Sequence, residues 1–185
     1  MDIQTELIYA CRDGKLDLVE LLISKGADVN SKDSDYYPLI VAILNGQTEI
    51  VKLLLSKKAN VFVGDSSYHS ALYIAIQRGH SEIAELLINE GSWVDEYDTK
   101  NYSLLMYAIV KRLSSIAELL ISKGADINKI NDAGETPLIL ASKFGNTSIV
   151  QLLISKGANL NARDNYHGEK LTSLLHALQN GDATT

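Results

Sequence analysis

The chain has 185 residues, of which 46% are apolar and 22% are charged, a balance typical of folded proteins that argues against intrinsic disorder. The net charge of −6 argues against a general binder of nucleic acid or acidic membranes, because both use clustered Lys and Arg. The sequence shows neither a membrane-length apolar run nor a secretory signal, and its single cysteine suits a reducing compartment, so we expect a cytoplasmic protein.

A ten-residue segment recurs along the chain, and its first copy, LLISKGADVN, ends at Asn30. Later copies end at Phe62, Asp95, Asn128 and Asn161. A second marker, an alanine, keeps the same step of 32 or 33 residues through Ala10, Ala42, Ala75, Ala108 and Ala141. Two markers in phase predict a stack of repeated units. We interpret 1–185 as one repeat domain with units at 1–30, 31–62, 63–95, 96–128, 129–161 and 162–181 and a tail at 182–185.

Each unit is predicted to contain two helices. In the unit 129–161, Thr136-Pro137 is typical of a helix start, and the apolar spacing continues to Gly145. A second apolar face runs over 148–154 and stops at Gly157. About ten polar residues separate one unit's second helix from the next helix start, which suits an extended turn or a short hairpin that projects from the helix pair.

The motifs Thr136-Pro137-Leu138-Ile139-Leu140-Ala141 and Gly124-Ala125-Asp126-Ile127-Asn128, with Gly145, resemble the ankyrin-repeat pattern. The resemblance extends from about Asp2 to Gly181 and implies an all-α solenoid of helix-turn-helix units with projecting turns, with four full repeats between truncated capping repeats. It also implies a concave binding surface, made by the first helices and the projecting turns.

Several positions depart from that pattern. The histidine expected after Thr-Pro-Leu is absent from every unit, which puts its usual hydrogen bonding to the turn in doubt; Ile8, Ile40, Tyr73, Met106, Ile139 and Leu175 stand there. Lys58 and Arg112 replace helix-ending glycines, and each is expected to cost about 1 kcal/mol if its backbone has a positive φ.

We expect a partner protein to bind the turns and one side of each first helix. That side contains the residues two and three positions after each marker alanine. It also contains the residue directly before each alanine, and these residues are Tyr9, Val41, Ile74, Tyr107, Leu140 and His176. Aromatic residues concentrate in the turns, and Tyr and Trp are favoured interface anchors. The alternative is that some rings brace neighbouring repeats. The predicted partner-binding residues are Tyr36, Tyr37, Tyr68, His69, Arg78, Trp93, Tyr97, Tyr102, Lys111, Phe144 and Tyr166.

The sequence offers no catalytic motif. Its four histidines do not pair with Cys, Asp or Glu at metal-ligand spacing, and its glycines follow the repeat instead of forming a phosphate loop. We therefore expect no enzyme, no metal and no cofactor.

The predicted function is a protein-protein interaction module, namely an adaptor or scaffold, an effector or an inhibitor, that is a monomer on its own and binds neither nucleic acid nor membrane. One alternative is a dedicated immunity protein that neutralises a toxin or enzyme. The other is a structural homo-oligomer.

Overall fold

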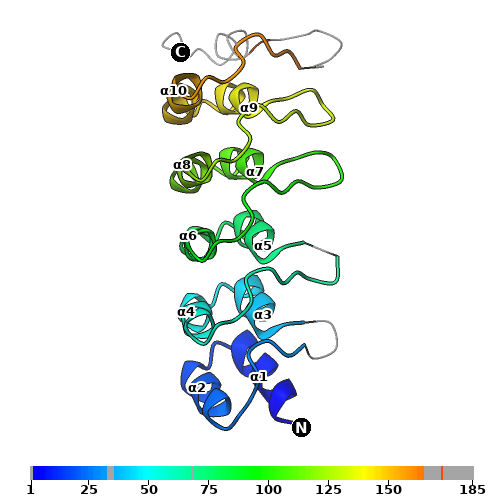
Figure 1. Cartoon of the computed structure of the whole chain (residues 1–185), viewed down its shortest axis with the longest axis vertical. Coiled ribbons are helices and arrows are strands. Elements are labelled where there is room, and N and C mark those ends of the chain that lie inside the picture. The colour runs from blue at the N-terminus through cyan, green and yellow to red at the C-terminus, as the bar shows by residue number, and fades with distance from the viewer. Residues whose placement is uncertain (1, 33–35, 68, 165–171, 173–185) are drawn as a thin grey trace. The chain divides into compact units, whose positions relative to one another are not determined.

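The computed structural model describes residues 2–32, 36–67, 69–164 and 172. These residues form ten α-helices and no strand, which confirms the predicted all-α class. The chain folds into two compact units, Met1–Trp93 and Val94–Thr185. In both units, helices lie in pairs and the connecting turns project on the side of the odd-numbered helices (Figure 1).

Unit 1 contains three helix pairs: α1 (Ile3–Arg12) and α2 (Leu16–Ser24), α3 (Pro38–Leu44) and α4 (Thr48–Ser56), and α5 (Ala71–Arg78) and α6 (Ser81–Asn89). The first helix of each pair contacts its own second helix, and within the unit α1 contacts α3 and α3 contacts α5. The second helices contact one another in the same order, α2 with α4 and α4 with α6. The unit is therefore a stack in which each repeat buries the apolar face of its neighbour.

Unit 2 contains two helix pairs, α7 (Leu104–Val110) with α8 (Ser114–Ser122) and α9 (Pro137–Lys143) with α10 (Thr147–Ser155). The contacts between α7 and α9 and between α8 and α10 repeat those of unit 1. Antiparallel bridges join Tyr97 to Ser103 and Arg163 to Thr172, as Gly64 and Ser70 are joined in unit 1. The projecting turns thus close as short hairpins, as the polar segments predict.

The start of α9 follows the predicted chemistry. The Thr136 hydroxyl accepts from the Ile139 N–H at 3.3 Å, and Pro137 opens α9. Ser70 caps α5 in the same way at 3.0 Å. The Ser of each LLIS or LLLS segment donates to the carbonyl three residues earlier and so closes a second helix; the pairs are Ser24–Leu21, Ser56–Leu53, Ser122–Leu119 and Ser155–Leu152. The repeated segment is therefore a helix terminator as well as a core element.

Lys58 and Arg112 have positive φ, at 66° and 58°, in place of glycine. The left-handed backbone that ends a helix is retained although both side chains disfavour it, so the expected local strain is present at both positions. Asn101 (φ 58°) was not predicted; it stands where the next turn has Gly134 (φ 79°), and asparagine tolerates this conformation better than most residues.

Three successive turns are closed by the side chain at their first residue. One side-chain oxygen of Asp65 accepts from two backbone N–H groups of its own turn, those of Ser67 (2.8 Å) and His69 (3.0 Å). Asp98 does the same with Lys100 and Tyr102, and Asn131 with Ala133 and Glu135. The turn hydrogen bonds therefore come from an Asp or Asn at the start of each hairpin.

One part of the predicted open surface is buried. The residues just before three marker alanines are only 6%, 4% and 1% exposed, and they are Val41, Ile74 and Leu140. They lie in first helices that pack against the first helices of neighbouring repeats, so their side chains belong to the core. Cys11 in α1 is fully buried as well. Tyr9, at the same position of α1, remains 42% exposed.

Candidate protein-binding surface

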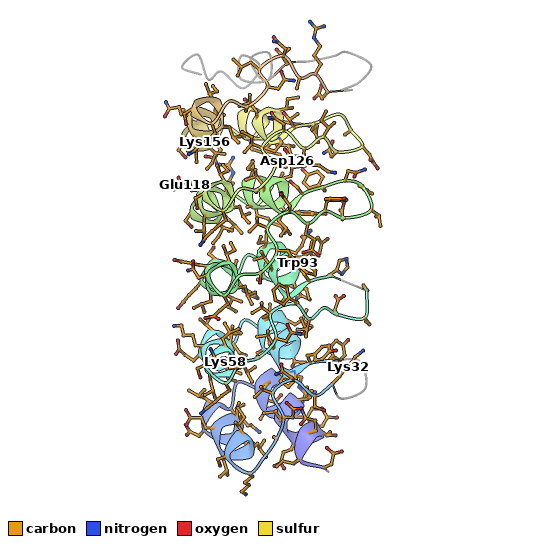
Figure 2. All side chains as sticks on the ribbon, in the orientation of Figure 1. Lys32, Lys58, Trp93, Glu118, Asp126 and Lys156 are labelled. Carbon is orange, nitrogen blue, oxygen red and sulfur yellow. The ribbon has the colours of Figure 1, made fainter. Side chains whose placement is uncertain are left out.

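Trp93 and Phe62 form an exposed aromatic pair in unit 1. Their ring centroids lie 5.1 Å apart at an interplanar angle of 43°. Trp93 is 69% exposed and Phe62 is 51% exposed. Each follows the end of a second helix, and Figure 2 labels Trp93. Large rings that remain this accessible while touching each other offer a ready anchor for another protein.

The aromatic pair occupies a position that is polar in the neighbouring repeats. In unit 1, the Asn30 side chain accepts from the backbone N–H of Asn60, thirty residues later, at 2.7 Å. In unit 2, Asp95 accepts from Asp126 at 2.7 Å, and Asn128 accepts from Asn159 at 2.8 Å. We call this hydrogen bond between successive repeats the Asx link.

Between the second and third repeats, Phe62 stands at the acceptor position of the Asx link and Trp93 at the donor position. Phenylalanine has no side-chain acceptor, so at this step a ring contact takes the place of the Asx link. Phe62 was not among the predicted binding residues. Its alignment with Asn30, Asp95 and Asn128 in the sequence could have identified it.

Tyr97, in unit 2, is 55% exposed, and the ammonium group of Lys129 lies 3.7 Å from the centre of its ring. This contact joins residues 32 positions apart, and Lys129 was not among the predicted binding residues. Tyr97 is thus an exposed ring whose face already carries a cation.

Tyr102 braces its turn rather than projecting freely. It is half-buried, and its ring lies 4.7 Å from that of Tyr107 in α7. Burial, with the carboxylates of Glu135 and Asp98, raises the pKa of Tyr102. The Tyr107 hydroxyl in turn donates to Asp98. This geometry favours the bracing alternative for Tyr102.

Asp98 and Asp65 keep low pKa values in spite of partial burial. Desolvation alone would raise the pKa of Asp98, but hydrogen bonds from the Tyr107 hydroxyl and from the backbone N–H groups of Tyr102 and Lys100 lower it further than burial raises it. At Asp65, the opposing donors are the backbone and side chain of His69 and the backbone of Ser67. Both carboxylates are therefore charged parts of the turns.

His69 is also half-buried and structural in its contacts. Its Nδ1 lies 3.2 Å from an oxygen of Asp65, and its ring stacks on Tyr73 with centroids 4.5 Å apart. The first helix therefore braces this turn through Tyr73, as α7 does in unit 2 through Tyr107.

The remaining predicted residues divide by exposure. Tyr36, Arg78 and Lys111 are exposed, whereas Tyr37 and Phe144 are half-buried. Phe144 accepts, through its backbone carbonyl, from the guanidinium of Arg112 at 3.1 Å. Tyr68 and Tyr166 lie outside the described residues.

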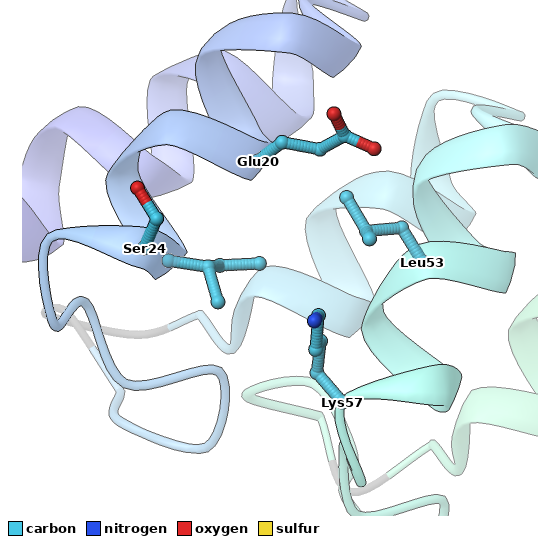
Figure 3. A pocket seen from close by; sticks show the side chains of 5 residues that line it. Glu20, Ser24, Leu53 and Lys57 are labelled. Atoms are coloured by element: carbon cyan, nitrogen blue, oxygen red, sulfur yellow. The ribbon is translucent and has the colours of Figure 1, made fainter.

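A groove of about 370 Å³ lies between α2 and α4 in unit 1 and is lined by Glu20, Ile23, Ser24, Leu53 and Lys57. Figure 3 shows the Glu20 carboxylate on the α2 side and the Lys57 amine on the α4 side. One carboxylate and one ammonium on an open apolar groove give a contact surface rather than a converging set of acids and bases. Within the described part of the chain, no group of three or more His, Cys, Asp or Glu side chains is placed to hold a metal ion, and no helix is long and apolar enough to cross a membrane.

Comparisons with known proteins identify the repeat. The family model described as "Ankyrin repeats (3 copies)" matches residues 2–65, 59–131 and 113–185. A search of curated proteins returned no matching relative. Among solved structures, the complex of the Bd0816 predatory endopeptidase from Bdellovibrio bacteriovorus with the immunity protein Bd3460 contains a similar chain. That chain is 31% identical with a TM-score of 0.78, and the match covers 96% of this chain and 92% of that one.

Ankyrin repeats mediate protein-protein interactions, and both the family and the neighbour favour a binding protein without enzymatic chemistry. The family model covers almost the whole sequence, and the ten helices form the paired stacks that it implies. The chain belongs to the ankyrin-repeat family.

Proposed function

We propose that this protein is an inhibitor of the immunity-protein type, which binds a peptidase and blocks it. The observation that carries the proposal is the likeness, over 96% of this chain, to a chain in the complex of an endopeptidase with its immunity protein. Because the match also covers 92% of the other chain, it concerns the whole repeat array and not a single repeat.

The proposed primary anchor is the aromatic pair in unit 1. Trp and Tyr dominate the binding energy of many interfaces, because each buries a large area at a small cost in side-chain entropy. The 69% exposure of Trp93 and the 51% exposure of Phe62 leave that area available. Within unit 1, the exposed residues Tyr36 and Arg78 would add polar contacts to this anchor. In unit 2, the exposed candidates for binding are Tyr97 and Lys111.

Inhibition in this proposal is steric. The protein supplies no catalytic group and no cofactor, and it covers the partner's surface as a monomer in the cytoplasm. The proposal keeps the predicted repeat boundaries. Within each compact unit, the turns of successive repeats would contribute to binding together.

The proposal is tested by inhibition. The purified protein would be added to endopeptidases encoded in its own genome, with Bd0816 as a reference enzyme, while hydrolysis of each enzyme's substrate is followed. We expect one of the endogenous enzymes to lose at least about 90% of its activity at a 1:1 ratio in the micromolar range, which corresponds to a Kd well below 1 μM. An unrelated ankyrin-repeat protein is the control for non-specific loss.

Two outcomes would overturn the proposal. One is full activity of every enzyme in the presence of an excess of folded protein. The other is concentration-dependent light scattering that shows self-assembly without any hetero-complex, which would instead support the homo-oligomer.

A further inference from the structure

A small cavity lies in unit 2 beside the exposed face of Tyr97. Its volume is about 190 Å³, and its lining residues are Asp95, Glu96, Tyr97, Ser103, Asp126 and Lys129. Pockets for drug-sized ligands usually measure about 300–1,000 Å³, so this cavity is suited to a single long side chain. We call it the Tyr97 cavity.

The Tyr97 cavity already holds a cationic group, supplied by the chain itself. The Lys129 ammonium lies 3.7 Å from the centre of the Tyr97 ring, within the distance at which the ring's negative face attracts a cation. Tyr97 is 55% exposed and Lys129 is half-buried, so the contact is reachable from solvent. The same ring face could receive another cation if Lys129 moved aside.

The charge around the ring favours a second cation. The lining contains the carboxylates of Asp95 and Asp126 and a single basic side chain, that of Lys129. Among the residues that the structure describes, neither Asp95 nor Asp126 forms an ion pair with Lys129 or any other base. These two carboxylates therefore carry more negative charge than the single lysine can balance.

The two aspartates are held in place by the backbone. One oxygen of Asp95 accepts from the Asp126 N–H at 2.7 Å, and one oxygen of Asp126 accepts from the Asn128 N–H at 2.8 Å. These bonds fix both carboxylates without neutralising them. A fixed pair of carboxylates beside an aromatic face is the arrangement that a planar guanidinium recognises best, because it can stack on the ring and donate to both acids.

We propose that the Tyr97 cavity binds an arginine side chain of a partner protein, which displaces Lys129 from the Tyr97 ring and lies between Asp95 and Asp126. The inference rests on the proposed function only in that the arginine belongs to a bound protein. It requires no peptidase, and it is tested without one.

The test is a titration of the ¹⁵N-labelled full chain with N-acetyl-arginine amide, followed by the backbone NMR signals. We expect saturable shifts at Tyr97, Asp126 and Lys129, with a Kd on the order of 1–10 mM for this single-residue probe, and weaker binding at high salt. N-acetyl-citrulline amide has nearly the same shape without the charge, and it should produce no saturable shift.

Two variants sharpen the test. Lys129→Met removes the competing ammonium but keeps the aliphatic stem, and it should tighten binding about two- to fivefold. Asp126→Asn keeps an acceptor for the Asn128 N–H and removes the charge, so it should weaken binding by a similar factor. Lys156→Met, an exposed change elsewhere in unit 2, is the control for loss of a positive charge.

Equal shifts with the citrulline probe would overturn the inference, as would unchanged or weaker arginine binding in Lys129→Met. Failure here with intact peptidase inhibition would reject this cavity alone. Failure of inhibition with intact arginine binding would reject the proposed peptidase partner and leave the cavity assigned.

Discussion

The step from Phe62 to Trp93 in unit 1 and the step from Asp95 to Asp126 in unit 2 occupy the same position of the repeat, yet their chemistry is opposite. The first is an exposed ring contact at 5.1 Å, and the second is a hydrogen bond of 2.7 Å. An aromatic pair and a hydrogen bond each contribute roughly 0.5–1.5 kcal/mol, so stability alone does not explain the exchange.

What distinguishes the two steps is what remains exposed. The Asx link leaves only small polar groups on the surface, whereas the aromatic pair leaves two large rings in water. An exposed apolar patch adds little to folding and much to association. The link position therefore tolerates either chemistry, and the proposed anchor role would account for the aromatic version.

The largest expected effect comes from converting the aromatic pair into an Asx link with Phe62→Asn and Trp93→Asp together. Stability should change by no more than about 1 kcal/mol, because one link replaces another. Inhibition should weaken at least ~30-fold, since loss of an interface anchor costs about 2 kcal/mol or more. Thermal unfolding and an inhibition titration measure the two effects.

Leu21→Ala is the matched control for that double variant, because Leu21 is also an exposed apolar residue of unit 1, at 47%. This variant should inhibit the peptidase within a factor of about two of the parent protein. Full inhibition by the double variant would show that the partner does not use the aromatic pair.

A second, smaller effect is expected at the Asx link of unit 2. Asn128→Ala removes the acceptor of the Asn159 N–H and should destabilise the fold by about 1 kcal/mol in urea unfolding. Asn128→Asp should stay within about 0.5 kcal/mol of the parent, because Asp95 makes the same bond with a carboxylate. Equal losses in both variants would mean that the link itself contributes nothing.

The strained helix end of unit 1 should respond to a glycine. Lys58→Gly is expected to stabilise the protein by about 0.5–1 kcal/mol, because glycine adopts the positive φ of 66° without the steric cost of a side chain. The converse change, Gly124→Lys at φ 93° in unit 2, should destabilise by a similar amount. Arg112→Gly should gain less, because it loses the bond from the guanidinium to the Phe144 carbonyl. Differential scanning calorimetry measures the change in unfolding temperature of each of the three variants and so ranks their stabilities.

The smallest effect is a dependence of stability on pH. The pKa values of Asp65 and Asp98 are lowered in the folded protein, so their stabilising effect is present above the unfolded value of about 3.9 and is lost as the pH falls through the folded value. Asn131 fills the same position without titrating. Unfolding curves from pH 6 to pH 2 should therefore show a shallower acid loss for Asp98→Asn. A parallel loss in the parent and the variant would contradict the assignment.

The sequence predicted the features that depend on local chemistry. The repeat period, the Thr136 cap and the helix ends at glycines all follow from residue types at fixed offsets. The same offsets marked Lys58 and Arg112 as the positions where a positive φ would be strained, and the structure shows that φ at both. Each is determined within one repeat, so one sequence suffices to recognise it.

Apart from the positive φ of Asn101, the features that were missed depend on contacts between repeats. Phe62 meets Trp93, and Lys129 meets Tyr97, across about one repeat length, and neither pairing is visible in the local pattern. The burial of Val41 has the same origin, since a residue that looks open on an isolated helix is covered by the next one. Which partner-binding residues the protein uses remains a prediction for the experiments above.

The single cysteine gives the protein a built-in reporter. Burial raises the pKa of the Cys11 thiol to about 12, and the side chain is fully covered in α1. Thiol reagents attack the thiolate, so labelling requires that the first helix pair open. The labelling rate of the unmodified chain, followed by mass spectrometry, therefore measures how often Cys11 becomes exposed, and a bound partner that stabilises the amino-terminal repeat should slow it.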